Sequence, residues 1–145
     1  MTFDEWTTLH PQAAADLSRV VDTVPVQAGK SEASVQAALR VEAAKIGYCL
    51  WRNNSGSLPD KTGTPVRFGL GNDSTKLKKI FSSSDLIGIG PNGKFVAVEV
   101  KAPGWKKPRD AHEVAQANFI GAVQARGGLA GFATSLEDYY RIVGQ

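Results

Sequence analysis

Cysteine and histidine are scarce in this chain of 145 residues, which has one cysteine and two histidines. A disulfide framework within one chain needs at least two cysteines and is therefore excluded. So few thiol and imidazole groups argue against a zinc site, and neither histidine is placed to serve a serine or cysteine nucleophile. Cys49 lies in an apolar run, so we expect a small buried side chain. His112 adjoins a helix cap and is expected at the surface.

Long apolar runs are also missing. No stretch of about 18 apolar residues could form a transmembrane helix, and no cationic leader followed by an apolar segment opens the chain. We therefore expect a soluble, cytoplasmic protein with no membrane partner. Hydrophobic residues nevertheless make up 42% of the chain. That content allows one domain to bury a core without disulfides or metal clusters.

Basic residues slightly outnumber acidic ones, and the formal net charge is +3. They gather on either side of one central segment: Lys76, Lys78 and Lys79 precede it, and Lys101, Lys106, Lys107 and Arg109 follow it. Such a cluster favours a polyanionic partner such as nucleic acid. An ordinary solvated surface is the alternative, and charge does not separate the two.

The central segment predicts a β-hairpin. Two apolar runs, 84–89 and 94–101, are joined by a Gly-Pro-Asn-Gly turn. Pro91 and Asn92 suit the centre of a type I turn, and Gly93 suits the left-handed residue that closes a three-residue loop. The turn therefore fixes which residues of the two strands face each other.

This register brings two carboxylates and an amine together. It places Asp85 opposite Glu99 and puts Lys101 on the Glu99 face, roughly 7 Å farther along the strand. Two carboxylates and a backbone carbonyl, assigned to Val100, are suitable oxygen ligands for Mg²⁺ or Mn²⁺. Phosphodiester hydrolysis uses such an ion to offset phosphate charge and activate water, and Lys101 would add orientation and electrostatic support. The alternative is a structural ion pair, since Glu-x-Lys is a common tripeptide.

Patterns around the hairpin predict a three-layer α/β/α sandwich. A helix over 31–46 begins at a Ser31 cap and ends before Gly47. Glu32 opens its apolar stripe, so this carboxylate either points toward the sheet or complements the positive helix end. A second helix over 110–126 carries Gln116 beside its buried stripe, with a reciprocal glutamate after the cap. The predicted buried stripes are Val35, Leu39, Ala43 and Ile46 in the first helix and Ala115, Phe119, Ala122 and Val123 in the second.

The remaining segments are predicted as short strands and loops. Strands are expected at 48–54, 66–68 and 129–134, with the last one parallel to its neighbour after a helical crossover. A terminal helix begins at Ser135 and runs through Tyr140. Residues 55–64 are expected to form a loop, and 69–83 are irregular apart from one helical turn at 76–81. Irregular chain of this length tends to be functional, so we expect it to border the ligand.

Several residues near these loops could contact nucleic acid. Arg52, Asn53 and Arg67 could bind phosphate, or they could simply end strands. Trp105, among Lys106 and Lys107, could stack on an exposed base or pack within the protein.

The first 28 residues stand apart from the rest. Phe3, Trp6 and Leu9 have helical spacing, and Ala13–Val21 could form a second short helix. We expect 1–28 to be an extension that packs on the core or on another copy of the chain, and 29–145 to be the main domain.

The combined pattern resembles the PD-(D/E)XK nuclease superfamily, in its virus-type replication-repair nuclease (VRR-NUC) branch. The residues that carry it are Glu32 on a helix, Asp85 before the turn, Glu99-Val100-Lys101 after it, and Gln116 on the next helix. The branch also shows patterns written here as Trp51-Arg52-Asn53-Asn54, Val66-Arg67-Phe68-Gly69, Asp85-Leu86-Ile87-Gly88-Ile89, and Gly127-Gly128 ahead of the last strand. The resemblance covers about residues 30 to 140.

This resemblance implies a restriction-endonuclease-like core of αβββαβ order. It implies Asp85 and Glu99 as metal ligands, Lys101 as the catalytic lysine, Glu32 as the additional helix acid, and Gln116 as a supporting residue. By its chemistry, Glu32 could serve a second metal or a metal-bound water. The resemblance also implies a homodimer that cuts branched DNA such as four-way (Holliday) junctions. The chain departs from the pattern at Ser84, where a proline is usual, and at 72–83, which looks inserted and bears on substrate preference.

Three hypotheses follow. The leading one is a divalent-metal-dependent, structure-selective DNA endonuclease that acts as a dimer. The second is a DNA-binding or partner-recruiting module with the same fold and little activity alone. The third is an ordinary α/β domain with a structural salt-bridge cluster, which predicts no metal-dependent stabilisation.

Overall fold

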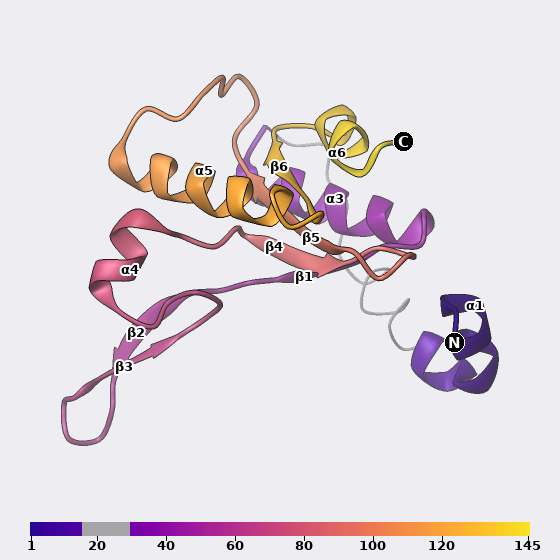
Figure 1. Cartoon of the computed structure of the whole chain (residues 1–145), viewed down its shortest axis with the longest axis horizontal. Helices are drawn as coiled ribbons and strands as arrows, with labels where there is room; N and C mark the ends of the chain where they lie inside the picture. Colours follow the sequence, from indigo (N-terminus) through magenta and orange to yellow (C-terminus); the bar gives the residue numbers. More distant parts are fainter. Residues whose placement is uncertain (16–29) are drawn as a thin grey trace.

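The computed structural model describes residues 1–15 and 30–145. Its centre is a four-stranded mixed sheet in the order β1-β4-β5-β6 (Figure 1). The strands are β1 (Cys49–Arg52), β4 (Leu86–Ile89), β5 (Phe95–Val100) and β6 (Leu129–Ala133). The β1–β4 and β4–β5 pairs are antiparallel, and β5–β6 is parallel. The predicted parallel last strand is thus confirmed.

Helices cover both faces of this sheet. On one face, α3 (Glu32–Lys45) and α6 (Leu136–Val143) share a core with β1, β4, β5 and β6. On the other face, α5 (Ala111–Gln124) packs on β5 and β6, where Phe119 and Ile120 meet Ala97 and Ala130. The predicted mixed α/β sandwich with a helix layer on each face is confirmed.

The helix α3 follows its predicted sequence signals. Ser31 accepts a hydrogen bond from the Ser34 backbone N–H, and Ser34 reciprocates toward the Ser31 backbone, which completes a capping box. Val35, Leu39 and Ala43 are buried, as their spacing predicts. This helix therefore covers the sheet face that lies opposite α5.

The hairpin formed by β4 and β5 has the predicted register. Leu86 pairs with Val98 and Ile89 with Phe95, which brings the preceding Asp85 level with Glu99. The turn closes through a 2.9 Å bond from the Gly90 backbone N–H to the Lys94 carbonyl oxygen. Gly93 has φ of 76°, a left-handed conformation that favours glycine. The turn chemistry thus sets the geometry on which the candidate site depends.

The loop prediction for 55–64 is wrong. Residues Gly56–Pro59 form β2, which pairs with β3 (Pro65–Phe68) in a separate two-stranded ribbon. The ribbon turn is organised by Asp60, whose carboxylate accepts the backbone N–H groups of Thr62 and Thr64. A short strand carrying Gly, Ser and Pro has no periodic apolar signal, so only its partner strand was recognisable. The predicted helical turn is confirmed as α4 (Thr75–Ile80).

Details of the C-terminal half also differ from expectation. In α5, Ile120 is buried while Ala122 and Val123 are only partly buried. Asp110 caps the helix, but the Glu113 carboxylate accepts the backbone N–H of Arg109 in place of the cap residue. The last strand, β6, ends at Ala133, and α6 extends to Val143, beyond the predicted Tyr140.

The N-terminal segment contains α1 (Phe3–Leu9), capped by Thr2, and residues 11–15 are also helical. Most of the predicted second helix, Ala13–Val21, lies outside the described residues. In the described ranges, no helix is long and apolar enough to cross a membrane.

Candidate active site

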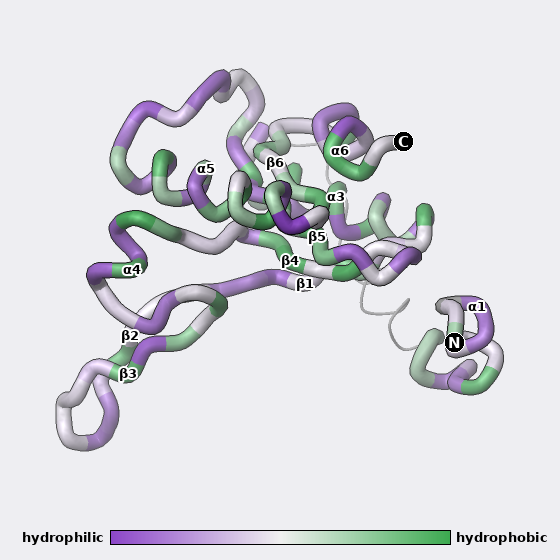
Figure 2. The backbone as a smooth tube through the Cα atoms, in the orientation of Figure 1, coloured by the Kyte–Doolittle hydropathy of each residue, from purple (hydrophilic) through white to green (hydrophobic). Residues whose placement is uncertain are grey.

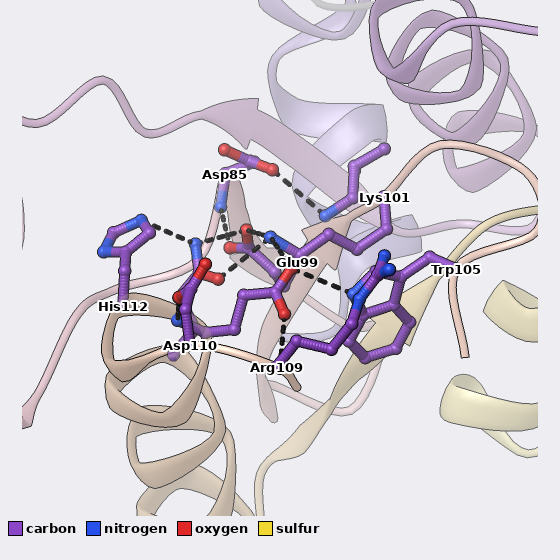
Figure 3. A network of polar contacts seen from close by, with 10 residues as sticks. Asp85, Glu99, Lys101, Trp105, Arg109, Asp110 and His112 are labelled. Atoms are coloured by element: carbon purple, nitrogen blue, oxygen red, sulfur yellow. Dashed lines mark hydrogen bonds and ion pairs between the residues drawn. The ribbon is translucent and has the colours of Figure 1, made fainter. Parts of the chain in front are cut away.

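The ends of β4 and β5 hold a pair of carboxylates. Asp85 donates its backbone N–H to Glu99 Oε2 at 3.2 Å, and its own Oδ2 accepts the Val100 backbone N–H at 3.1 Å. Each acid is therefore held by backbone from the opposing strand (Figure 3). Glu99 is 2% exposed, whereas Asp85 is partly buried. The acids are thus fixed at the sheet edge, with Asp85 as the more accessible of the two.

A buried amine completes this cluster. Lys101 follows β5 directly, is 9% exposed, and donates from Nζ to Glu99 Oε1 at 3.1 Å and to Gln116 Oε1 at 2.9 Å. Gln116 also donates from Nε2 to Glu99 Oε1. Because an ammonium group only donates, the lysine fixes the orientation of the Gln116 amide. The structure thus brings together the four predicted residues Asp85, Glu99, Lys101 and Gln116.

Burial and mutual repulsion raise the pKa values of the two acids in this cluster. Burial raises the pKa of Glu99 to about 7, with the Asp85 charge adding to the increase and Lys101 opposing it. Burial also raises the pKa of Asp85, while the Val100 N–H and Lys101 act against the shift. An additional positive charge at this position would therefore stabilise the ionised form of both carboxylates.

Glu32 has a looser connection to the site. It is the first residue of α3 and is exposed, so its side chain is not buried against the sheet. Its negative charge nevertheless acts on Asp85 and helps to raise the pKa of that acid. Among the described residues, no three or more Asp, Glu, His or Cys side chains are grouped to hold a metal ion. Glu32 thus belongs to the electrostatic surroundings of Asp85.

The oxygen atoms at these strand ends are suitable ligands for a hard divalent cation. Asp85 and Glu99 offer carboxylate oxygens, and the Val100 backbone adjoins Asp85. The N–H and C=O of a strand residue point to the same side, so the Val100 carbonyl shares this edge. Mg²⁺ is commonly bound by one or two carboxylates, with water and phosphate as its other ligands. The chemistry of the residues therefore fits Mg²⁺ or Mn²⁺.

Two residues of the network were not predicted to support the site. Glu113 Oε1 lies 3.9 Å from Lys101 Nζ and accepts the Trp105 indole N–H at 3.0 Å. His112 Nε2 lies 3.2 Å from Gln116 Nε2. Glu113 was visible in the sequence only as a residue near a helix cap, and His112 was expected simply at the surface. Their spacing from Gln116 on one helix was the available signal.

The predicted nucleic-acid contacts fall into two groups. Some have structural partners: Asn53 donates to Ser83 Oγ and to the Ser84 carbonyl oxygen, Arg67 bonds Asn72 and Thr75, and Trp105 stacks on Phe132 with ring centroids 4.5 Å apart. The others carry side chains that reach solvent: Arg52, Lys76, Lys79, Lys106 and Lys107 are exposed, and Lys78 is partly buried. The second group is better placed to meet phosphate directly.

Glu113 ties the basic loop at 102–110 to the cluster of Asp85, Glu99 and Lys101: it binds Trp105 and the Arg109 backbone and approaches Lys101. Under the DNA endonuclease function proposed in the next subsection, we expect Glu113→Ala to increase the DNA dissociation constant about fivefold, because the loop lysines lose their fixed position. The cleavage rate at saturating DNA should change much less, since Lys101 keeps its bonds to Glu99 and Gln116. Binding and single-turnover cleavage assays separate the two effects, with Glu137→Ala in α6 as an exposed control. An unchanged dissociation constant would contradict this role.

Comparison of the chain with protein-family models, curated proteins and solved structures found no match.

Proposed function

We propose that this chain is a divalent-metal-dependent DNA endonuclease that hydrolyses phosphodiester bonds, with a PD-(D/E)XK core of the VRR-NUC type. The observation that carries the proposal is the pairing of Asp85 and Glu99 across two strands, with the buried Lys101 bonded to Glu99. Buried ionisable groups are costly unless they are paired or functional. Two acids beside one amine leave an excess of negative charge that a divalent cation would balance.

The residues of the cluster would have distinct roles. Asp85, Glu99 and the Val100 carbonyl would bind Mg²⁺ or Mn²⁺, and the bound ion would supply Lewis acidity and a water nucleophile near neutral pH. Lys101, held by Glu99 and Gln116, would orient that water and offset the charge that develops on the phosphate. Gln116 would keep the lysine and the acid in register. Glu32 would adjust the potential at Asp85 or serve a second ion.

A substrate panel tests the proposal directly. Labelled four-way, flap and linear DNA are incubated with the protein in Mg²⁺, Mn²⁺ or EDTA, beside Glu99→Ala and the exposed-acid control Glu137→Ala. We expect cleavage with either metal, none in EDTA, and loss of cleavage in Glu99→Ala only. Binding without cleavage under every metal condition would refute the enzyme proposal. Cleavage that survives in Glu99→Ala would refute the site assignment.

A DNA-binding or partner-recruiting module is the competing proposal. It is favoured by the exposure of Glu32, which leaves Asp85 and Glu99 as the only predicted metal-ligand carboxylates that are buried or partly buried. The intact lysine and its buried network favour the enzyme, because binding to phosphate alone does not need a buried ion pair. The Mg²⁺ and Mn²⁺ arms of the panel distinguish the two proposals, because only the enzyme would cleave DNA in them.

We further propose a homodimer acting on branched DNA such as four-way junctions. Two copies would present two sites, one for each strand that must be cut. The support is the resemblance to the nuclease branch together with the apolar content of the N-terminal extension, where Leu9 is 66% exposed. A solution mass of two chains at working concentration would support the dimer, and a mass of one chain would refute it.

A further inference from the structure

The β2–β3 ribbon carries an apolar stripe on one face. Leu58 and Val66 pair directly across the ribbon, and they are 65% and 53% exposed. Phe68 lies two residues from Val66, on the same face, and is 43% exposed. Its ring covers Gly56, where a Cβ atom would come within 2.7 Å of the ring. We call Leu58, Val66 and Phe68 the ribbon stripe.

The ribbon projects from the sandwich and is held firmly at its root (Figures 1 and 2). Asn72 is 4% exposed and donates to the carbonyl oxygens of Gly56 and Phe68 at 2.7 and 2.8 Å. The same side chain accepts a bond from Arg67 Nη1 at 3.1 Å, on the ribbon face opposite the stripe. A buried amide with all these partners fixes the ribbon in one orientation. Its exposed apolar side chains are therefore presented on a preorganised support.

The segment that contains the ribbon is one of two parts of the chain in which positive charge is concentrated, the other being 101–109. Residues 52–80 include six basic and two acidic side chains, a net charge of +4, whereas the whole chain carries +3. The exposed cations here are Arg52, Lys61, Lys76 and Lys79. An apolar stripe carried on a basic segment fits a ligand with an anionic backbone and apolar faces. Nucleic acid has both.

The ribbon is connected directly to the candidate site. Asn53, at the end of β1, donates its backbone N–H to the Asp85 carbonyl oxygen at 2.7 Å. Its side chain bonds Ser83 Oγ and accepts the Leu70 backbone N–H at 3.3 Å. The chain therefore enters the ribbon after Asn53, which is bonded to Asp85, and comes back to Asn53 at Leu70. The root of the ribbon thus lies beside the carboxylate pair.

We propose that the ribbon stripe is a wedge that packs against the exposed base-pair face at a DNA branch point. Leu58 and Val66 contact the unstacked bases, and the surrounding cations bind the phosphates of the diverging strands. This inference rests on the proposed function and deepens it, because it assigns the choice of branched over linear DNA to a particular surface. A continuous duplex has no exposed base-pair face, so the stripe has no partner there.

The test uses Leu58→Thr/Val66→Thr, since threonine keeps the strand preference while it removes apolar surface. Ile89→Thr is the matched control, because Ile89 is 48% exposed in β4, outside the basic segment. Affinity for four-way and linear DNA of equal length is measured in EDTA by fluorescence anisotropy, so cleavage is not required. A 2-aminopurine base at the branch reports unstacking. Solution mass is measured on the same samples.

We expect wild type to prefer the four-way DNA about tenfold and to increase 2-aminopurine fluorescence. The double variant should lose both effects and keep the wild-type affinity for linear DNA, and Ile89→Thr should behave as wild type. If the double variant retains the branch preference, or if wild type has none, the wedge is refuted whether or not the protein cleaves DNA. A mass that falls from two chains to one in the double variant would assign the stripe to a second copy and also refute it. If the double variant loses the branch preference and wild type cleaves no DNA, the result would support the wedge and refute the nuclease.

Discussion

Lys101→Met is expected to lower the single-turnover rate of DNA cleavage by about 10²- to 10³-fold at saturating Mg²⁺. Methionine has a side chain of similar length to the aliphatic part of lysine, but it lacks the ammonium group that is bonded to Glu99 and Gln116. The loss should fall on the rate and not on DNA affinity, because Lys101 is 9% exposed and makes its contacts within the protein. Measuring both quantities separates a catalytic lysine from one that only binds phosphate.

The control for this variant is Lys107→Met, which removes an exposed lysine of the neighbouring loop. It should weaken DNA binding slightly and more so at low salt, with little change in the rate at saturation. Circular dichroism and the melting temperature Tm establish that each variant is folded. A Lys101→Met rate within twofold of wild type would remove Lys101 from the chemistry.

The second large effect is expected in the pH dependence of metal binding. The pKa of Glu99 is raised by burial and by Asp85 to about 7, from an ordinary 4.5. The folded protein thus binds a proton that the unfolded chain releases, so the free energy of unfolding should decrease as pH rises from about 4.5 to about 7. The shift corresponds to a change on the order of 3 kcal/mol. A cation must displace this proton, so its dissociation constant should fall about tenfold per pH unit below pH 7 and level off above it.

Calorimetric titration with Mg²⁺ or Mn²⁺ in buffers of different ionisation enthalpy counts the protons released on binding. Thermal unfolding with metal or EDTA gives the matching increase in Tm, which should be larger at pH 8 than at pH 5.5. Asp85→Ala should abolish the metal-induced increase, whereas Glu137→Ala should keep it. Metal binding that is independent of pH, or that persists in Asp85→Ala, would contradict the assignment of these acids as ligands.

The hairpin that carries the acids could be predicted because its signals are local. Gly93 and its neighbours fix the turn, and strand alternation then places Asp85 level with Glu99. The α3 helix was equally accessible, since Ser31 and the apolar stripe specify its start and its buried face. Such features depend on residues within a few positions of one another, and one sequence displays them fully.

The features that the sequence did not reveal depend on individual side-chain contacts and not on a periodic pattern or a turn signal. The strand Gly56–Pro59 has little propensity of its own; it pairs with β3, and Asn72 binds the Gly56 carbonyl oxygen at its start. Glu113 looked like a cap residue, yet its carboxylate reaches Trp105 and approaches Lys101. These contacts form where a loop packs against a helix, and the spacing of apolar residues in the sequence does not predict them.

The short connection between Asp85 and Glu99 also has a consequence for the order of folding. The two acids lie 14 positions apart on one hairpin, so they meet as soon as this local unit closes. The bond from the Lys101 backbone N–H to the Ala133 carbonyl oxygen needs the distant β6 strand, and Gln116 needs α5. We therefore expect the carboxylates to pair while water still surrounds them and their compensating cation to be locked in later. The two carboxylates therefore come together first, in water, and they are buried only when Lys101 and Gln116 are in place to stabilise them.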